Sequence, residues 1–382
     1  MAVSTAIITI NPARETMTGA ASRNSSPTCA RRRSAVDRRG AVMIGHAGLW
    51  FKNGQNAARL AILNGLTNRS RIVHKTTGTV APDAWRGLAP NPGRADSQAT
   101  TALPRKTPQT MTDDALDLPG GFARIRPCRH GRMMYNPNDA YVGRSLDVYG
   151  EYSEAEASFL RFLVRPGDIV VEAGANIGSL TVVLAKAVGP DGWVVAYEPQ
   201  RIPFQMLCSN ALLGGFANIE ARPTAAGAAP GSIAVPQLDP TRPNNFGGLS
   251  LQGNEGAQGL TVAVETIDSL ALPRCRLIKA DVEGMEADVL DGARATIARH
   301  RPMLYLENDR RDRAPLLIRH VRALGYRLWW HTPVYFNPGN FRGATENIFP
   351  GEGAFNMFCA PQELAITISV PEILSDDSWP TP

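Results

Sequence analysis

The chain has 382 residues, of which 43% are hydrophobic and 20% are charged, a composition that supplies enough apolar material for a hydrophobic core. Its net charge is +5, but the first 110 residues hold 16 Lys and Arg against four Asp and Glu, whereas the remainder holds 24 against 31. The body of the chain is therefore mildly acidic, and we expect no nucleic-acid partner. The most apolar stretch, residues 169–188, contains Glu172, Asn176 and Lys186, so we also expect no membrane span.

Cysteine and histidine positions exclude several kinds of site. The five cysteines form no CxxC pair, which argues against a zinc ribbon, a thioredoxin-type site or a disulfide scaffold. The six histidines show no ligand spacing, and we expect no metal site; the alternative is a catechol-type magnesium mechanism, for which nothing in the sequence calls. No basic region precedes the short apolar run at residues 6–10, so no secretory signal is expected and the predicted location is the cytoplasm.

The N-terminal part differs in amino-acid composition from the rest. Residues 1–110 are rich in Ala, Arg, Thr, Ser, Asn and Pro, carry basic clusters at residues 31–33 and 38–39, and show little apolar periodicity. Such a segment buries too little surface to offset its ordering entropy. We expect residues 1–118 to be a disordered basic extension and residues 119–382 to be the folded domain. The alternatives are a basic tail for an acidic partner, an Arg-rich transit peptide, or sequence upstream of a start at Met111.

Helical and strand patterns alternate along the rest of the chain. Residues 153–164 predict an amphipathic helix that begins with the capping-box pattern Ser153-x-x-Glu156. Residues 227–259 are rich in Gly, Pro, Asn and Gln and predict an irregular insertion. The expected strands are 169–171, 193–198, 218–223, 261–264, 276–281, 303–307, 326–331 and 354–359, and the further helices are 180–188, 204–213, 286–299 and 314–324.

This order predicts an α/β fold with a mainly parallel sheet and helices on both faces. No clear helix separates the last two strands, which favours an antiparallel hairpin at one edge of the sheet.

A glycine-rich turn follows the first of these strands. Gly174, Ala175, Asn176 and Gly178 lie where glycine lets the chain turn sharply and lets a ligand approach the start of a helix. Glu198, 26 residues after Glu172, ends the next strand, where a carboxylate can accept hydrogen bonds from both hydroxyls of a ribose. The pattern indicates a cofactor that contains adenosine; the alternative is a packing turn without a ligand.

The same turn lacks the dinucleotide and P-loop fingerprints. Asn176 and Ser179 stand where GxGxxG requires glycine, and no Lys-Ser/Thr pair follows the glycines. An acidic residue, Glu172, two positions before the first glycine suits a cationic ligand better than a pyrophosphate. S-adenosylmethionine carries a sulfonium and an ammonium group and matches that charge.

A second acidic cluster follows a later strand. Asp281 and Glu283 come directly after an apolar strand and Glu307 ends the next one, so all three are expected at the same sheet edge as Glu172. Carboxylates gathered on one rim repel each other unless cations occupy it. The alternative for Glu283 and Glu286 is that they cap the following helix.

Several segments in this order and at this spacing resemble the FkbM-type S-adenosylmethionine-dependent methyltransferases. They are residues 172–178, 196–199, 266–270, 279–286, 289–293 and 301–302, and the resemblance covers roughly residues 145–360. It implies a Rossmann-like class I methyltransferase fold with a seven-stranded sheet, and O-methylation, often of sugar hydroxyls or secondary metabolites.

Carried over by position, the resemblance places the glycine turn at the methionine part of the cofactor, Glu198 at the ribose, and Asp281 near the cofactor's amino group. One departure is Glu172, where the family more often has Asp and a side chain shorter by one methylene. The cofactor-binding residues expected in this way are Glu154, Glu172, Gly174, Ala175, Asn176, Gly178, Glu198, Ala225 and Asp281.

Transfer to a hydroxyl requires a base within hydrogen-bond reach of the acceptor. Our candidates for this base are Glu283 and His331, and Asp281 is a third candidate. His331 ends a predicted strand, and imidazole titrates near neutrality; the alternative is a histidine held by hydrogen bonds in a loop. Residues 333–343 mix aromatic and Asn side chains, as carbohydrate pockets do, although such aromatics can also simply pack.

The leading hypothesis is an S-adenosylmethionine-dependent methyltransferase that acts on a hydroxyl of a sugar, glycan or secondary metabolite, with a small-molecule or glycan acceptor as its partner. The alternative is a non-catalytic module that binds an adenosine ligand and recruits a partner through its basic tail. A nicotinamide dehydrogenase is disfavoured by Asn176 and Ser179.

Overall fold

The computed structural model describes residues 8–10, 115–251, 259–368, 370 and 372–380. All of them belong to one compact unit, residues 1–46 and 111–382, and the second unit, Ala47–Thr110, lies outside the described residues. Most of the expected extension, residues 1–118, also lies outside them. Two short pieces of it form strands: β1 (Ile8–Ile10) pairs antiparallel with β15 (Ile366–Ile368), and β2 (Leu116–Asp117) pairs with β3 (Arg124–Cys128).

A seven-stranded sheet forms the centre of this unit, in the order β13-β14-β12-β11-β5-β6-β7. β14 is antiparallel to both of its neighbours, and the pairings among the other strands are parallel. The predicted α/β class and the predicted seven-stranded, mainly parallel sheet are thereby confirmed. The strands are β5 (Ile169–Ala173), β6 (Trp193–Tyr197), β7 (Ile219–Arg222), β11 (Leu277–Ala280), β12 (Met303–Glu307), β13 (Tyr326–His331) and β14 (Asn356–Pro361).

The predicted antiparallel hairpin at one edge of the sheet, β13 with β14, is present. β14 lies between β12 and β13, and all six of its residues are buried. β13, with three partly exposed residues, is the edge strand. A fully buried strand needs neighbours on both sides, because water is not available to its backbone groups.

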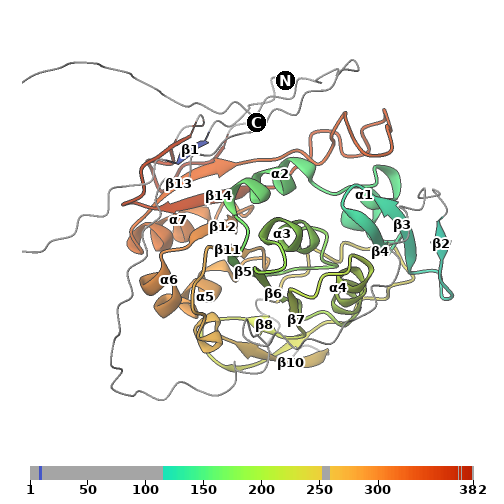
Figure 1. Ribbon diagram of the computed structural model, residues 1–382, viewed down its shortest axis with the longest axis horizontal. Helices are drawn as coiled ribbons and strands as arrows, with labels where there is room; N and C mark the ends of the chain where they lie inside the picture. Colours follow the sequence, from blue (N-terminus) through green and yellow to red (C-terminus); the bar gives the residue numbers. More distant parts are fainter. Residues whose placement is uncertain (1–7, 11–114, 252–258, 369, 371, 381–382) are drawn as a thin grey trace, which may run out of the picture. The chain divides into compact units, whose positions relative to one another are not determined.

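Helices cover both faces of the sheet, as predicted (Figure 1). One side holds α2 (Glu154–Leu163), α3 (Thr181–Val188) and α4 (Arg201–Leu213), and the other holds α5 (Glu286–Asp291), α6 (Arg294–His300) and α7 (Ala314–Ala323). No helix of the described residues combines the length and apolar character needed to cross a membrane.

Two local expectations were wrong. The helix expected over residues 286–299 is divided at Gly292 and Ala293, because the Asp268 carboxylate accepts the backbone N–H groups of Ala295 and Thr296 and so caps a new helix. The insertion at residues 227–259 is not wholly irregular. It contains β9 (Gly231–Val235), which pairs with β10 (Leu260–Glu265) in a small sheet that also includes β8 (Ala225–Ala226).

The predicted capping box of α2 also takes another form. Ser153 has a left-handed backbone (φ 46°) and makes no side-chain cap hydrogen bond to the helix. Its hydroxyl instead donates to the carboxylate of Glu156 at 2.9 Å. The pair therefore fixes the Glu156 side chain rather than the end of the helix.

The remaining elements flank the sheet. β4 (Gly131–Tyr135) pairs antiparallel with β3, α1 (Val142–Val148) follows it, and a short 3₁₀ helix (Ile267–Leu270) lies between β10 and β11.

The strand order reverses between β5 and β11, and this switch point brings their following loops together. Gly174 has a φ of +80°, and a Cβ built on it would lie 1.7 Å from the carbonyl oxygen of Asp281. Only glycine fits this close approach of two backbones. The glycine turn and the Asp281 loop are therefore neighbours for a steric reason.

Helix α4 supports the glycine turn from below. Leu207 is fully buried against Ala175 and Ala196. The buried Asn210 donates hydrogen bonds to the carbonyl groups of Ile177 and Met134 at 2.7 and 2.9 Å. The buried face of α4 thus holds the turn in place.

We expect Leu207→Ala to lower the free energy of unfolding by about 2–5 kcal/mol, because it leaves a cavity under the glycine turn. Leu212→Ala is the matched control on the same helix, since Leu212 is 81% exposed and its truncation should cost less than about 0.5 kcal/mol. Urea unfolding of both variants measures the difference, and equal losses would contradict this packing.

Candidate functional site

A cavity of about 430 Å³ opens at the carboxyl edge of the sheet, over the switch point. The ends of β5, β6, β11 and β12 line it, together with β8 and parts of segments 245–251 and 351–355. Of the described residues that line it, eight are Asp or Glu and one is Lys. The cavity is therefore strongly acidic and suits a cationic ligand.

Glu172 lies on the floor of the cavity, in strand β5. Its carboxylate is buried and accepts a hydrogen bond from the Thr181 hydroxyl at 2.6 Å. Burial raises the pKa of Glu172, while the ammonium group of Lys279 acts in the opposite direction. The longer side chain at this position is thus fixed by the first turn of α3.

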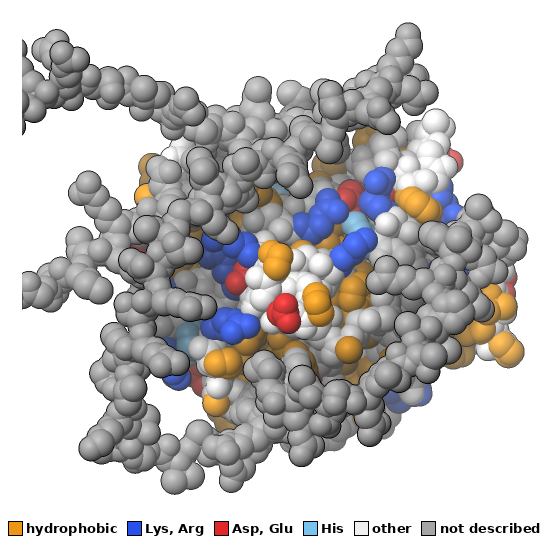
Figure 2. Space-filling model, viewed as in Figure 1, with side chains coloured by type: hydrophobic (Ala, Val, Ile, Leu, Met, Phe, Trp, Pro, Cys, Tyr) orange, Lys and Arg blue, Asp and Glu red, His pale blue; other side chains and the backbone are white. Residues whose placement is uncertain are grey.

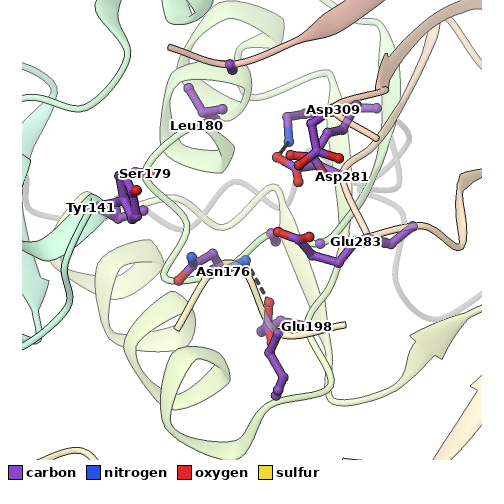
Figure 3. A pocket seen from close by; sticks show the side chains of 18 of the residues that line it. Tyr141, Asn176, Ser179, Leu180, Glu198, Asp281, Glu283 and Asp309 are labelled. Carbon is purple, nitrogen blue, oxygen red and sulfur yellow. Dashed lines mark hydrogen bonds and ion pairs between the residues drawn. The ribbon is translucent and has the colours of Figure 1, made fainter. Parts of the chain in front are cut away.

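Glu198 follows β6 and ties the glycine turn to the sheet. One carboxylate oxygen accepts the backbone N–H of Asn176 at 2.8 Å (Figure 3), and the other accepts that of Gln200 at 2.8 Å. Burial raises the pKa of Glu198 to about 7, against the effect of these two hydrogen bonds. Asn176 itself has a left-handed backbone (φ 51°), which brings its N–H toward Glu198.

Sequence reasoning missed Lys279 as a site residue. Its side chain is only 2% exposed, and its Nζ lies 3.1 Å from Oδ2 of Asp281. Burial lowers the pKa of Lys279, but the carboxylates of Asp281, Glu172 and Glu156 outweigh that effect and raise it. The signal was a lysine inside an otherwise apolar strand, which a buried strand tolerates only beside carboxylates.

A second group of carboxylates lies beside Asp281, at the ends of β11 and β12. Glu283 has a left-handed backbone (φ 56°), and Nη2 of Arg310 lies 2.9 Å from its Oε2. Burial, Asp281 and Asp309 raise the pKa of Glu283 to about 7, while Arg310 opposes them. Asp281, Glu283 and Asp309 gather on one side of the cavity, away from Tyr141 (Figure 3).

Most of the residues predicted from the sequence come together here. The lining includes Glu172, Gly174, Ala175, Asn176, Glu198, Ala225, Asp281 and Glu283. Gly178 is not among the lining residues: it has a φ of +83°, and a Cβ on it would lie 2.6 Å from Cδ1 of Leu207. Its role in the described structure is to shape the turn.

Glu154 does not line the cavity. Its carboxylate lies 2.7 Å from Nε2 of His130 and 3.2 Å from Nη2 of Arg161, and these partners lower its pKa although burial opposes them. Basic side chains and a histidine are visible near α2 on the face drawn in Figure 2. Glu156 lines the cavity instead, because side chains two positions apart point to opposite sides of a helix.

His331 is also outside the cavity lining. Its Nδ1 is 2.7 Å from the Tyr305 hydroxyl, and its ring stacks on Phe159 with centroids 4.3 Å apart. Burial lowers the pKa of His331 to about 4, so the ring is neutral near pH 7. This placement argues against His331 as the base and favours a structural histidine.

Aromatic rings also line the cavity. Tyr141, Tyr152 and Tyr335 line the cavity. Tyr335 stacks on Tyr152 at a centroid distance of 5.7 Å, and Tyr141 stacks on Phe349 at 5.7 Å. Of the expected aromatic and Asn segment, Tyr335 is thus the residue that reaches the cavity.

Solved structures with some likeness to this chain include several methyltransferases. Methyltransferase FkbM from Methylobacillus flagellatus KT is 20% identical over 53% of this chain and 50% of its own, with a TM-score of 0.35. An S-adenosylmethionine-dependent O-methyltransferase from Thermotoga maritima is 15% identical over 62% and 77%, with a TM-score of 0.34. A putative O-methyltransferase from Klebsiella pneumoniae is 16% identical over 58% and 90%, with a TM-score of 0.33. The match thus spans half the length of the Methylobacillus chain.

Part of the chain matches a known protein family. The family described as the methyltransferase FkbM domain matches residues 172–328, which run from the first acidic residue of the cavity floor into β13. This stretch of the chain is therefore similar to methyltransferase FkbM domains.

Proposed function

We propose that the chain is an S-adenosylmethionine-dependent methyltransferase that methylates a hydroxyl oxygen of a sugar, glycan or secondary metabolite. The observation that carries the proposal is one acidic cavity, at the switch point of an FkbM domain, in which Glu172, Glu198 and Asp281 meet. Ligands of open α/β sheets bind at this place.

The residues present fit this cofactor. Its sulfonium and ammonium groups match a lining with eight acidic residues and one lysine. In this proposal Glu198 would accept the ribose hydroxyls, and Ala225 and Ala226, which also line the cavity, would lie beside the adenine ring. When bound, the cofactor supplies an electrophilic methyl group on a good leaving group.

The other half of the cavity offers an acceptor site. Tyr152 and Tyr335 provide ring faces for the apolar side of a sugar, and Glu283 lies beside Asp281, where it can take the hydroxyl proton. These further side chains beside the proposed cofactor residues favour an enzyme over the alternative, a module that only binds an adenosine ligand.

The proposed location is the cytoplasm. The four described cysteines, Cys128, Cys208, Cys275 and Cys359, are all free thiols, which suits a reducing compartment.

Glu198→Gln should weaken binding of S-adenosylmethionine by at least about tenfold, because charge-assisted hydrogen bonds to the ribose are lost. Glu363→Gln is the control, since Glu363 pairs with Arg301 at an exposed position and does not line the cavity. Titration calorimetry gives both affinities. A wild-type protein that takes up NAD but neither S-adenosylmethionine nor S-adenosylhomocysteine would contradict the proposed function.

The affinity should also depend on pH through Glu198, whose pKa is about 7. The ribose hydroxyls donate to the ionised carboxylate, so the contribution of Glu198 to the affinity should level off above about pH 8, where the ammonium group of the ligand begins to lose its own proton. The affinity should fall by about tenfold per unit between pH 7 and pH 5.5, where the ammonium group of the ligand stays charged. Calorimetry of Glu198→Gln should give a flatter pH profile; an unchanged slope would show that another group titrates.

Turnover measurements should show which of Glu283 and His331 acts as the base. We expect Glu283→Gln to lower the rate of S-adenosylhomocysteine release by about 100-fold or more while cofactor binding persists. His331→Gln should retain most of that rate, because His331 lies outside the cavity lining. The measurement uses an acceptor found by screening hydroxylated sugars and metabolites. A large loss in His331→Gln, with cofactor affinity unchanged, would return His331 to the mechanism.

A further inference from the structure

Three carboxylates converge in the acceptor half of the cavity. Asp281 and Glu283 come from the loop after β11, and Glu307 is the last residue of β12. One oxygen from each of the three lies within 4.8 Å of the others. Parallel neighbouring strands explain the convergence, because β11 and β12 end at the same edge of the sheet.

The three carboxylates differ in how they are neutralised. Nζ of Lys279 is 3.1 Å from Oδ2 of Asp281, and Nη2 of Arg310 is 2.9 Å from Oε2 of Glu283. Oε2 of Glu307, in contrast, is shielded from solvent and has no hydrogen-bond partner among the described residues.

A shielded carboxylate oxygen without a partner is costly, and it is stabilised either by a proton or by a cation. Lys279 contacts one oxygen of Asp281, and Arg310 contacts one oxygen of Glu283. Each of the three carboxylates therefore has an oxygen that neither basic side chain contacts. Oxygens on opposite sides of Mg²⁺ lie about 4.2 Å apart, and those on opposite sides of Ca²⁺ about 4.6–5.2 Å apart. The separations here fall in the range that a hard divalent cation accepts.

We propose that Asp281, Glu283 and Glu307 bind a divalent cation, of the Mg²⁺, Mn²⁺ or Ca²⁺ kind, in the acceptor half of the cavity. The three ligands are all carboxylates, the type that such cations prefer. The site revises the expectation, drawn from histidine spacing, that the chain has no metal site.

The cation would define the class of acceptor, an argument that rests on the proposed methyltransferase function. An ion held by three carboxylates keeps further positions for oxygen ligands, which two adjacent hydroxyls of one molecule can fill. Coordination orients the hydroxyl and lowers its pKa. The acceptor class is therefore a vicinal diol, and Glu283 would still take the proton that the coordinated hydroxyl loses.

The test measures cation binding to the full chain without cofactor or acceptor. Electron paramagnetic resonance of added MnCl₂ should show one bound ion per chain, and MgCl₂ or CaCl₂ should displace it. Glu307→Gln and, independently, Glu283→Gln should each weaken Mn²⁺ binding by at least about tenfold. Glu363→Gln should leave it unchanged, and circular dichroism confirms that each variant is folded.

Two results would overturn the cation site. One is a wild-type chain that binds no Mn²⁺, with an infrared band of a protonated carboxyl that disappears in Glu307→Gln. The other is Mn²⁺ binding that neither carboxamide variant changes, which would mean an adventitious ion only. Calorimetry with S-adenosylmethionine in the presence of a chelator reports on the proposed function separately. Cofactor binding without Mn²⁺ binding therefore removes the cation site alone.

Discussion

The organisation of this site depends on negative charge held next to one buried ammonium group. Lys279 projects from the central strand β11 and faces Asp281, Glu172 and Glu156, three carboxylates from three different elements. A buried lysine is stable only with such partners, and the carboxylates are stable together only because it separates them. Arg310 pairs with Glu283, and Lys279 is the one basic side chain among the described residues that line the cavity. The remaining excess of negative charge suits a cationic ligand.

Backbone sterics fix where that charge is placed. The contact of Gly174 with the carbonyl of Asp281 brings the loops of β5 and β11 together, and Glu198 accepts the N–H of Asn176 from the opposite side. Leu207 and Asn210 of α4 support the turn from below. The floor of the cavity is thus built from backbone contacts and buried side chains, which a ligand does not need to rearrange.

The residues that lie at the ends of strands could be predicted from the sequence, whereas the helix residues that face the cavity could not. Glu198 and Asp281 directly follow strands, so their place at the sheet edge is determined by topology alone, and the cavity contains both. Glu154 and Glu156 differ only in their direction from α2, which depends on how the helix rotates against the sheet. His331 ends an edge strand, but its ring turns toward Phe159 and Tyr305 because of tertiary packing. The position of β14 between β12 and β13 likewise depends on tertiary packing, and the alternation of helices and strands along the sequence does not predict it.

Asp281 belongs to both halves of the cavity, the proposed cofactor side and the proposed acceptor side. It faces the proposed cofactor through its place beside Gly174, and it faces Glu283 and Glu307 on the acceptor side. A change at Asp281 also removes the partner of Lys279 and leaves that ammonium group with Glu172 and Glu156. Loss of function at Asp281 would therefore not distinguish cofactor binding, cation binding and local charge balance. Glu198 and Glu307 each contact one half alone, so the two halves are separable at those positions.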